Sequence, residues 1–391
     1  MKQTNLCYGK QKFIVEKRDI IQKSTIDFSF LLILIVILTI GTLMVYSAGY
    51  PYATSHYGDG AYYIKRQVIF LVIGSLAMLM LSSIPTELYK KTSPYFYGIC
   101  VILLILVLFG GFSEGVAKRW LGIPGTPLSF QPSELMKLGI ILILAWYTDK
   151  KTKEENGLVK DIIIPGIFLF GACGLVLLEK HLSGTIIIAL IGIAVLFISG
   201  ASIKKMLFVY GITATVGATV FLLTNSYAMK RIESFLNPNA DVLSDKWQTT
   251  QGLYAIGSGG FFGLGYMNSR QKYSYVSEPQ NDFIFTVYCE EMGFIGALLL
   301  IFLFILLIWR GYVIALNTPD IFSSLVAFGI TSQIAIQVFL NMAVVTDLIP
   351  NTGISLPFFS YGGSSLVILM CEMGIILSIS KRARLKSRRI I

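Results

Sequence analysis

The stretch FSFLLILIVILTIGTLMVYSA, residues 28–48, contains no charged side chain. Its length matches the about 20 apolar residues that a helix needs to cross the hydrocarbon core of a bilayer. The whole chain shares this character, since 54% of its 391 residues are hydrophobic and only 14% are charged. A segment that spans lipid must satisfy its backbone hydrogen bonds internally, as helices do. We therefore expect an all-α, polytopic membrane protein.

Similar apolar runs recur along the chain. They predict about ten transmembrane helices, at 28–48, 66–85, 94–112, 133–148, 159–178, 183–200, 205–224, 283–309, 321–346 and 355–380. The first run is longer than the about 7–15 apolar residues of a signal peptide, so we expect an anchor that is not cleaved. The helices form one membrane domain, 28–380, which contains a single long extracellular loop at 225–282.

Basic residues are distributed unevenly between alternate loops. If both termini are cytoplasmic, the inside segments carry 21 Lys and Arg residues and the outside segments carry ten. Cytoplasmic segments are the basic ones in membrane proteins, so we expect cytoplasmic basic tails at 1–27 and 381–391 in a plasma-membrane protein. The net charge of +10 then favours contact with anionic headgroups and not with nucleic acid.

Cysteine, histidine and glycine patterns argue against three kinds of site. The five cysteines are widely spaced without a C-x-x-C pair, and there are two histidines, which fits neither a structural zinc site nor a disulfide framework. The run GSGGFFGLG at 257–265 loosely resembles a dinucleotide fingerprint, but it does not lie within a βαβ unit. Close backbone packing is the alternative explanation for these glycines.

One acid stands directly before an apolar span. Asp282 precedes FIFTVY, and an aspartate at that position commonly caps the helix N-terminus. An acid at the membrane boundary is also partly desolvated, which raises its pKa and suits it to general-base chemistry near neutral pH. Both interpretations stay open on the sequence alone.

Two further acids lie inside the same span. Glu290 and Glu291 are costly in a membrane helix, so we expect them to face the bundle interior with a partner. Lys137 in the fourth helix, which follows Glu134 by three residues, is the partner we expect for one of them. We assign these four residues to positioning and bundle packing.

Cations gather in two of the outer segments. Lys118, Arg119 and Trp120 lie between the third and fourth helices, and Arg270 and Lys272 lie in the long loop. Cations beside an indole suit a phosphate group and a sugar face, although an interfacial anchor would use the same residue types.

The last outer corner reads NTGISLPFFSYGGSS, residues 351–365. Its proline and glycines interrupt the helix, and polar side chains such as Ser360 and Ser364 could line a cavity there. A tight reentrant turn without a ligand is the alternative.

Six motifs occur together in one order along the chain. They are KRWLGI at 118–123, FQPSELMK at 130–137, GSGGFFGLG at 257–265, SRQKY at 269–273, EPQNDFIFTVYCEEMGFIG at 278–296 and LIPNTGISLPFFSYGGSS at 348–365. With them the chain resembles the SEDS family, which contains RodA, FtsW and SpoVE, over essentially all of 28–380. The SRQKY run is more similar to the FtsW/SpoVE branch than to the RodA branch.

This resemblance implies a peptidoglycan glycosyltransferase that polymerises lipid II into β-1,4 glycan strands at the outer face of the membrane, for cell division or cell shape. It implies that Asp282, in the DFIF motif, is the essential catalytic residue. It also maps substrate-binding or positioning roles onto the RW and QPSE–K motifs, here Arg119, Trp120, Gln131, Ser133, Glu134 and Lys137.

The chain departs from the family pattern at three places. Gln280-Asn281 replaces a common His-Thr pair, and EKHLSGT at 179–185 replaces an Asp-Leu-Gly-Thr type of sequence. Asp347 stands where glycine is common.

The implied reaction inverts an anomeric centre, because an α-linked diphosphate becomes a β-1,4 bond. A single displacement needs one base, for which Asp282 is the candidate, and positive charge that stabilises the departing diphosphate. The candidates for that charge are Lys118, Arg119, Arg270 and Lys272, and a divalent cation such as Mg or Mn could assist.

Two other functions remain open on the sequence. A lipid II flippase would need a polar route across the membrane midplane, and a non-catalytic scaffold that recruits a transpeptidase would not need Asp282. Since the chain contains no large soluble domain for cross-linking, the implied partner is a class B penicillin-binding protein transpeptidase, together with divisome or elongasome proteins.

Overall fold

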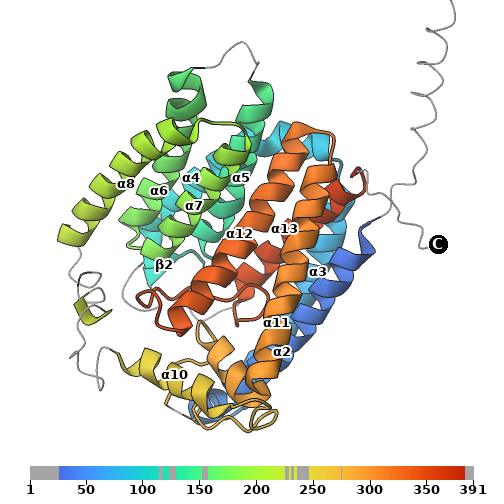
Figure 1. Cartoon of the computed structure of the whole chain (residues 1–391), viewed down its shortest axis with the longest axis vertical. Coiled ribbons are helices and arrows are strands. Elements are labelled where there is room, and N and C mark those ends of the chain that lie inside the picture. Colours follow the sequence, from blue (N-terminus) through green and yellow to red (C-terminus); the bar gives the residue numbers. More distant parts are fainter. Residues whose placement is uncertain are drawn as a thin grey trace, which may run out of the picture.

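The computed structural model places a helical bundle (Figure 1) and describes most of the chain. The described residues are 26–113, 118–122, 129–151, 157–224, 229, 233–235, 246–273 and 275–383. The expected basic tails therefore lie almost entirely outside the described residues, as do parts of the long loop.

Helices corresponding to all ten expected spans occur in the described part of the chain, which confirms the all-α membrane architecture. They are α2 (Phe28–Tyr57), α3 (Tyr62–Ser82), α4 (Thr86–Gly110), α5 (Pro132–Lys150), α6 (Ile164–Leu178, preceded by the π-helical turn η2, Val159–Ile163), α7 (Leu182–Ile198), α8 (Ile203–Thr224), α11 (Ile284–Asn317), α12 (Ile321–Val345) and α13 (Gly363–Ser380). Eight of these spans are long and apolar enough to cross a bilayer. Of the other two, α7 has only 17 residues, and α5 carries four charged residues, Glu134, Lys137, Asp149 and Lys150.

Helix α2 is longer than its apolar sequence predicts. The Asp27 side chain accepts a hydrogen bond from the Phe30 amide and caps the start, and the helix continues through Pro51 until Gly58, whose φ of 68° ends it. Thirty residues extend about 45 Å at 1.5 Å per residue, which exceeds a hydrocarbon core of about 30 Å. The last turns are rich in tyrosine, a residue type that suits the interface.

The core of the bundle lies around α5, α12 and α13. Helices α12 and α13 are mostly buried within the protein, whereas α3 and α8 expose most of their side chains. Figure 1 shows α8 at one edge of the bundle and α12 between α7 and α11, with which it is in contact. Exposed apolar side chains such as Leu76 and Phe208 are in keeping with lipid-facing surfaces.

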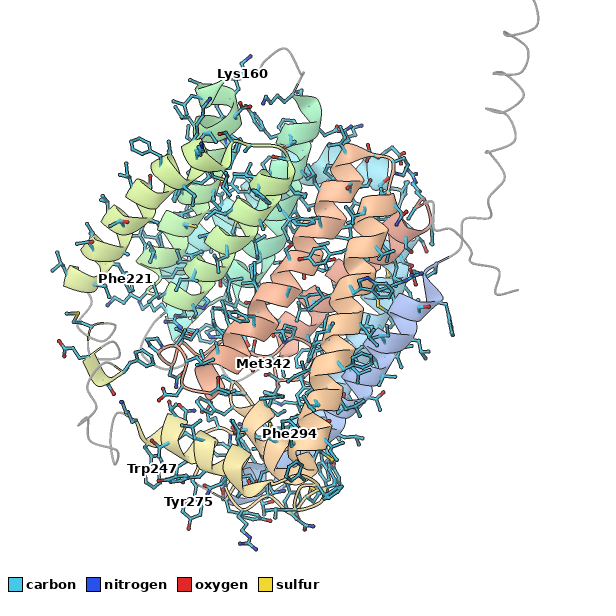
Figure 2. The ribbon with its side chains drawn as sticks, viewed as in Figure 1. Lys160, Phe221, Trp247, Tyr275, Phe294 and Met342 are labelled. Carbon is cyan, nitrogen blue, oxygen red and sulfur yellow. The ribbon has the colours of Figure 1, made fainter. Side chains whose placement is uncertain are left out.

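The long loop contains a helix that hydropathy does not reveal. Helix α10 (Trp247–Ser258) lies across one end of the bundle (Figure 1) and packs on α11, so that a Cβ on Gly252 would meet Phe283 at 3.0 Å. We call this end of the bundle the α10 end. Figure 2 shows Trp247 and Tyr275 there and Lys160 at the opposite end.

Two short segments complete the α10 end. Strands β1 (Phe112–Ser113) and β2 (Lys118–Trp120) pair antiparallel between α4 and α5. Helix α13 begins at Gly363, eight residues later than the apolar pattern predicts. The residues before it form a non-helical corner, because Pro357 lacks a backbone donor and Phe358 adopts a φ of 63°.

Candidate functional site

Asp282 lies in the turn that leads into α11 at the α10 end. Its side chain is half-buried. The helix begins at Ile284, and Phe283, which has no side-chain capping hydrogen bond, occupies the N-cap position. The interpretation of Asp282 as the N-cap residue is therefore wrong.

The backbone of Asp282 is fixed by one amide side chain. The Nδ2 atom of Asn341, near the end of α12, donates to the Asp282 carbonyl oxygen at 2.8 Å and to the Ile354 carbonyl oxygen at 2.7 Å. The Asp282 carboxylate also lies beside Gly353, where an added Cβ would stand 3.7 Å from Oδ2. The end of α12 and the corner that follows it thus meet the turn before α11 at this acid.

The corner before α13 is attached to the turn before α11 and to α10. The Tyr361 amide donates to the Gln280 carbonyl oxygen at 2.8 Å. Asn351 Nδ2 donates to Gln248 Oε1, in α10, at 3.1 Å. The segment around Asp282 is consequently held on two sides.

The two serines expected to line a cavity in this corner differ in environment. Ser360 is buried, and its Oγ accepts a hydrogen bond from the Leu356 amide at 2.8 Å, so it stabilises the turn. Ser364 is half-buried in the first turn of α13. Ser364 is therefore more accessible than Ser360.

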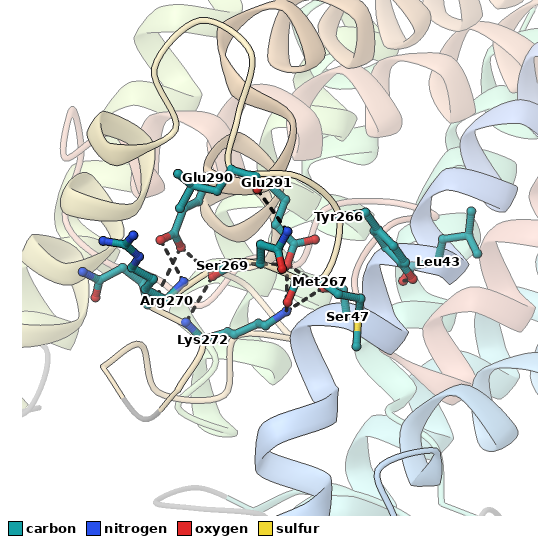
Figure 3. A network of polar contacts seen from close by, with 12 residues as sticks. Leu43, Ser47, Tyr266, Met267, Ser269, Arg270, Lys272, Glu290 and Glu291 are labelled. Atoms are coloured by element: carbon teal, nitrogen blue, oxygen red, sulfur yellow. Dashed lines mark hydrogen bonds and ion pairs between the residues drawn. The ribbon is translucent and has the colours of Figure 1, made fainter.

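Glu291 is the centre of a buried polar network (Figure 3). Its Oε1 accepts from Lys272 Nζ at 2.8 Å and from Ser47 Oγ at 2.6 Å, and the side chains of both Lys272 and Glu291 are fully buried. Lys272 Nζ also donates to Ser47 Oγ at 3.0 Å and to the Met267 carbonyl oxygen at 2.8 Å. The network joins α2, the long loop and α11.

Glu290 binds the same loop through backbone amides. Its Oε1 accepts from the Arg270 amide at 2.9 Å, and its Oε2 accepts from the Gln271 amide at 3.3 Å and from Ser269 Oγ. The Arg270 side chain itself is exposed. The Glu290 carboxylate thus fastens the loop at residues 269–271 to α11.

These contacts correct two expectations about lysines. Lys137 pairs with Glu134 at 2.7 Å and not with Glu290 or Glu291. Lys272 is buried in its ion pair with Glu291, so its ammonium group is not on a surface that a diphosphate could reach. The sequence could not show which of Arg270 and Lys272 faces outward, because the two cations lie two residues apart in the same loop.

Helix α11 is broken where the glycine-rich run meets it. Gly293 has φ 67° and ψ −169°, a conformation essentially restricted to glycine. The carbonyl oxygens of Gly260 and Phe261 accept hydrogen bonds from the amides that follow the break, Phe294 and Ile295, at 2.8 and 3.2 Å. A Cβ on Gly263 would lie 2.1 Å from the Glu291 carbonyl oxygen. The glycines therefore permit close backbone packing.

A second polar group at the α10 end lies beside β2. Arg119 Nη2 donates to the Lys180 carbonyl oxygen at 2.6 Å, in the turn between α6 and α7. Lys118 is exposed, and Trp120 is half-buried opposite Phe112 in the hairpin. The RW motif thus faces the turn that carries the EKHLSGT segment.

That turn holds two perturbed titratable groups. Gln131 Nε2 and Ser133 Oγ contact His181 Nδ1 at 3.1 and 3.2 Å. Burial, with Arg119 nearby, lowers the pKa of His181 to about 3, so the imidazole is neutral. Burial raises the pKa of Glu179 to about 8, although Arg119 opposes the shift. Perturbed groups of this kind gather at functional sites.

An acid that the sequence interpretation missed lies at the middle of α13. Glu372 is fully buried, and both of its carboxylate oxygens accept from Gln333 Nε2 of α12, at 3.0 and 2.9 Å. The signal was present in the sequence, since a lone acid interrupts an apolar span there.

The residues described here do not assemble a metal-binding cluster. Within the described ranges, no three His, Cys, Asp or Glu side chains come together in a way that could hold a metal ion. Among the cations proposed to bind a diphosphate, Lys118, Arg119 and Arg270 are at least partly exposed at the α10 end.

Comparison with known proteins places this arrangement among related chains. The model of the family described as cell cycle protein, which unites FtsW, RodA and SpoVE, matches residues 28–385. Stage V sporulation protein E of Bacillus subtilis is 40% identical over 93% of this chain and 99% of its own length. A probable peptidoglycan glycosyltransferase FtsW of Trichlorobacter lovleyi is 37% identical, covering 92% of this chain and 94% of that protein.

Solved structures share the fold along almost the whole chain. One belongs to a peptidoglycan synthase complex, studied for its coordination of polymerization and crosslinking. It has a TM-score of 0.75 at 25% identity and covers 91% of this chain and 97% of that one. The rod shape determining protein RodA of Thermus thermophilus has a TM-score of 0.68 at 27% identity and covers 92% and 98%.

Proposed function

Because this chain belongs to the cell cycle protein family of FtsW, RodA and SpoVE, we propose that it is a peptidoglycan glycosyltransferase that polymerises lipid II. Relatives that carry this activity in their names match it over more than nine-tenths of its length. The site geometry supports the same reaction, since an acid and several cations lie at one end of a membrane bundle.

The observation that carries the proposal is the placement of Asp282. Asn341 fixes its backbone, and the side chain is half-buried beside Gly353. In the proposed step the acceptor sugar oxygen attacks the donor anomeric carbon while its proton passes to the Asp282 carboxylate. The bond from that carbon to the diphosphate breaks, and the diphosphate takes the bonding electron pair, so the centre inverts.

Arg119 and Arg270 are the proposed partners of the departing diphosphate. Guanidinium groups match phosphate oxygens in a bidentate manner and stay charged at all relevant pH values. Lys118 is exposed and could add charge, whereas Lys272 is removed from this role by its buried ion pair. A divalent cation such as Mg or Mn on the diphosphate remains a proposal that rests on the chemistry of the substrate.

We infer that the α10 end faces the outside of the cell. In the sequence, the segments that alternate with the loops of the α10 end carry 21 Lys and Arg residues against ten, and the positive-inside rule assigns the more basic set to the cytoplasm. Both termini would then be cytoplasmic. The inference agrees with the chemistry, because lipid II is polymerised where its sugar is outside and its prenyl chain stays in the bilayer.

A transpeptidase of the class B penicillin-binding type is the proposed partner. A structural relative of this chain belongs to a peptidoglycan synthase complex in which polymerization and crosslinking are coordinated. The likeness to that chain covers 91% of this one, which supports an association of the same kind. A role in division, elongation or sporulation would follow from the partner.

Polymerisation of purified lipid II by the Asp282→Asn variant tests the proposal. We expect glycan product to fall to background, because the amide cannot accept the proton, while elution and unfolding resemble the wild type. Asp347→Asn is the matched control, since Asp347 lies at the same end and its φ of 57° suits asparagine as well. Normal polymer from Asp282→Asn, or lipid II translocation without polymer by the wild type in vesicles, would contradict the enzyme and favour a scaffold or a flippase.

A further inference from the structure

A stripe of amide side chains runs along one face of α12. Gln333, Gln337 and Asn341 follow one another at intervals of four residues, which places them on the same side of a helix. All three are buried, and each has a side-chain oxygen without a hydrogen-bond partner among the described residues. Buried polar groups in proteins are normally satisfied, by ordered water where no protein group is available.

The stripe connects the site of Asp282 with the buried acid of α13. At one end Asn341 Nδ2 contacts the Asp282 carbonyl oxygen, and at the other Gln333 Nε2 contacts both oxygens of Glu372. Eight residues of helix separate Gln333 from Asn341, a distance of about 12 Å at 1.5 Å per residue. Glu372 is the tenth of the 18 residues of α13, so the stripe reaches from the α10 end to the middle of the bundle.

The charges around Glu372 do not balance if its carboxyl group is ionised. Lys137 and Glu134 of α5 are the charged residues that interact with Glu372 through their electric fields. Lys137, however, is already paired with Glu134 at 2.7 Å. Gln333 offers a neutral amide. An ionised Glu372 would therefore add an uncompensated charge to the interior of a membrane bundle, which is strongly unfavourable. A proton on Glu372 removes this cost.

A buried acid that holds a proton needs a route by which the proton arrives and leaves. We propose that Gln333, Gln337 and Asn341 line a track of ordered water through which the Glu372 carboxyl group exchanges its proton with the medium at the α10 end. Each unpartnered amide oxygen accepts a hydrogen bond from one water, and each water passes one proton along as it receives another. No oxidant or second substrate is involved, and the track does not depend on the polymerase activity.

Infrared spectroscopy of the full-length protein in nanodiscs tests the track. The carboxylic-acid C=O band of Glu372 is identified as the difference between the wild type and Glu372→Gln, and its shift is followed after transfer into D2O. We expect the Gln337→Leu variant, which removes the central acceptor, to slow this shift by roughly tenfold or more, since tenfold corresponds to about 1.4 kcal/mol in a barrier. Ile336→Leu, a neighbouring substitution off the stripe, should exchange as the wild type does.

Two outcomes would overturn the proposal. One is the absence of any carboxylic-acid band that disappears in Glu372→Gln, which would mean that no proton is held there. The other is exchange in Gln337→Leu at the wild-type rate, which would mean that the amides do not carry the route. Should Gln337→Leu fail to fold, Gln337→Met keeps the length and flexibility of the side chain without its amide and serves in the same measurement.

Discussion

The buried ion pair between Lys272 and Glu291 gives the sharpest test of the structure. Replacing Lys272 with Met leaves the Glu291 carboxylate fully buried without its counter-charge, with Ser47 Oγ and the Ser269 amide as its remaining donors. Removal of one partner from a buried pair typically costs about 3–5 kcal/mol. We expect a loss of this size in the free energy of unfolding of Lys272→Met.

The assay is reversible unfolding in mixed micelles of increasing SDS content, followed by circular dichroism. The double variant Lys272→Met/Glu291→Gln should recover most of the loss, because replacing both charges leaves no buried ion. Lys65→Met is the matched control, since its ion pair with Asp59 is exposed on both sides, and such pairs contribute about 0–1 kcal/mol.

Two results would refute this reasoning. The first is a loss of under about 1 kcal/mol in Lys272→Met, a value expected of a surface pair. The second is a double variant that folds as stably as the wild type but no longer polymerises lipid II. That result would return Lys272 to the diphosphate-binding role that its position in the loop suggests.

Three further predictions concern the remaining parts of the site. The pKa of Glu179 is near 8 in the folded protein against 4.5 ordinarily. Between pH 4.5 and pH 8 the folded state therefore holds a proton on Glu179 that the unfolded state has lost, so stability should decline as pH rises towards 8. In Glu179→Gln the midpoint of unfolding, measured across this pH range, should depend less on pH. Gly293→Ala should destabilise the protein by roughly 1–3 kcal/mol through backbone strain, while Gly171→Ala, which meets open space, should not. Asn341→Leu should lower kcat by about a hundredfold if it misplaces Asp282, and an unchanged kcat would contradict that positioning role.

Much of the fold follows from hydropathy, because a helix in lipid needs only length and apolarity. The ends of helices follow less well. Helix α2 continues past Pro51 into the interface, and α13 starts late because Pro357 and the strained Phe358 hold a non-helical corner. Helix α10 gives no hydropathy signal, because the polar residues Gln248, Thr249, Thr250 and Gln251 fill its first turns.

The candidate site was predictable in its residue types and less so in its pairings. Asp282 stands out because it directly precedes an apolar span, whereas the partner of Glu291 depends on how a distant loop folds back. Periodicity cannot tell that Lys272 turns inward and Arg270 outward. The conformation of Asp347 supplies a reason for its place, since its φ of 57° lies in the region that glycine favours and aspartate tolerates.

The order of synthesis gives the Lys272–Glu291 pair a consequence for membrane insertion. Lys272 leaves the ribosome 19 residues before Glu291, and Ser47 has by then long been in place. The acids of α11 thus enter the bilayer only after their cation and hydroxyl partners have been made. Moving the loop to the C-terminus by circular permutation would reverse this order and expose two unpaired carboxylates to the insertion machinery.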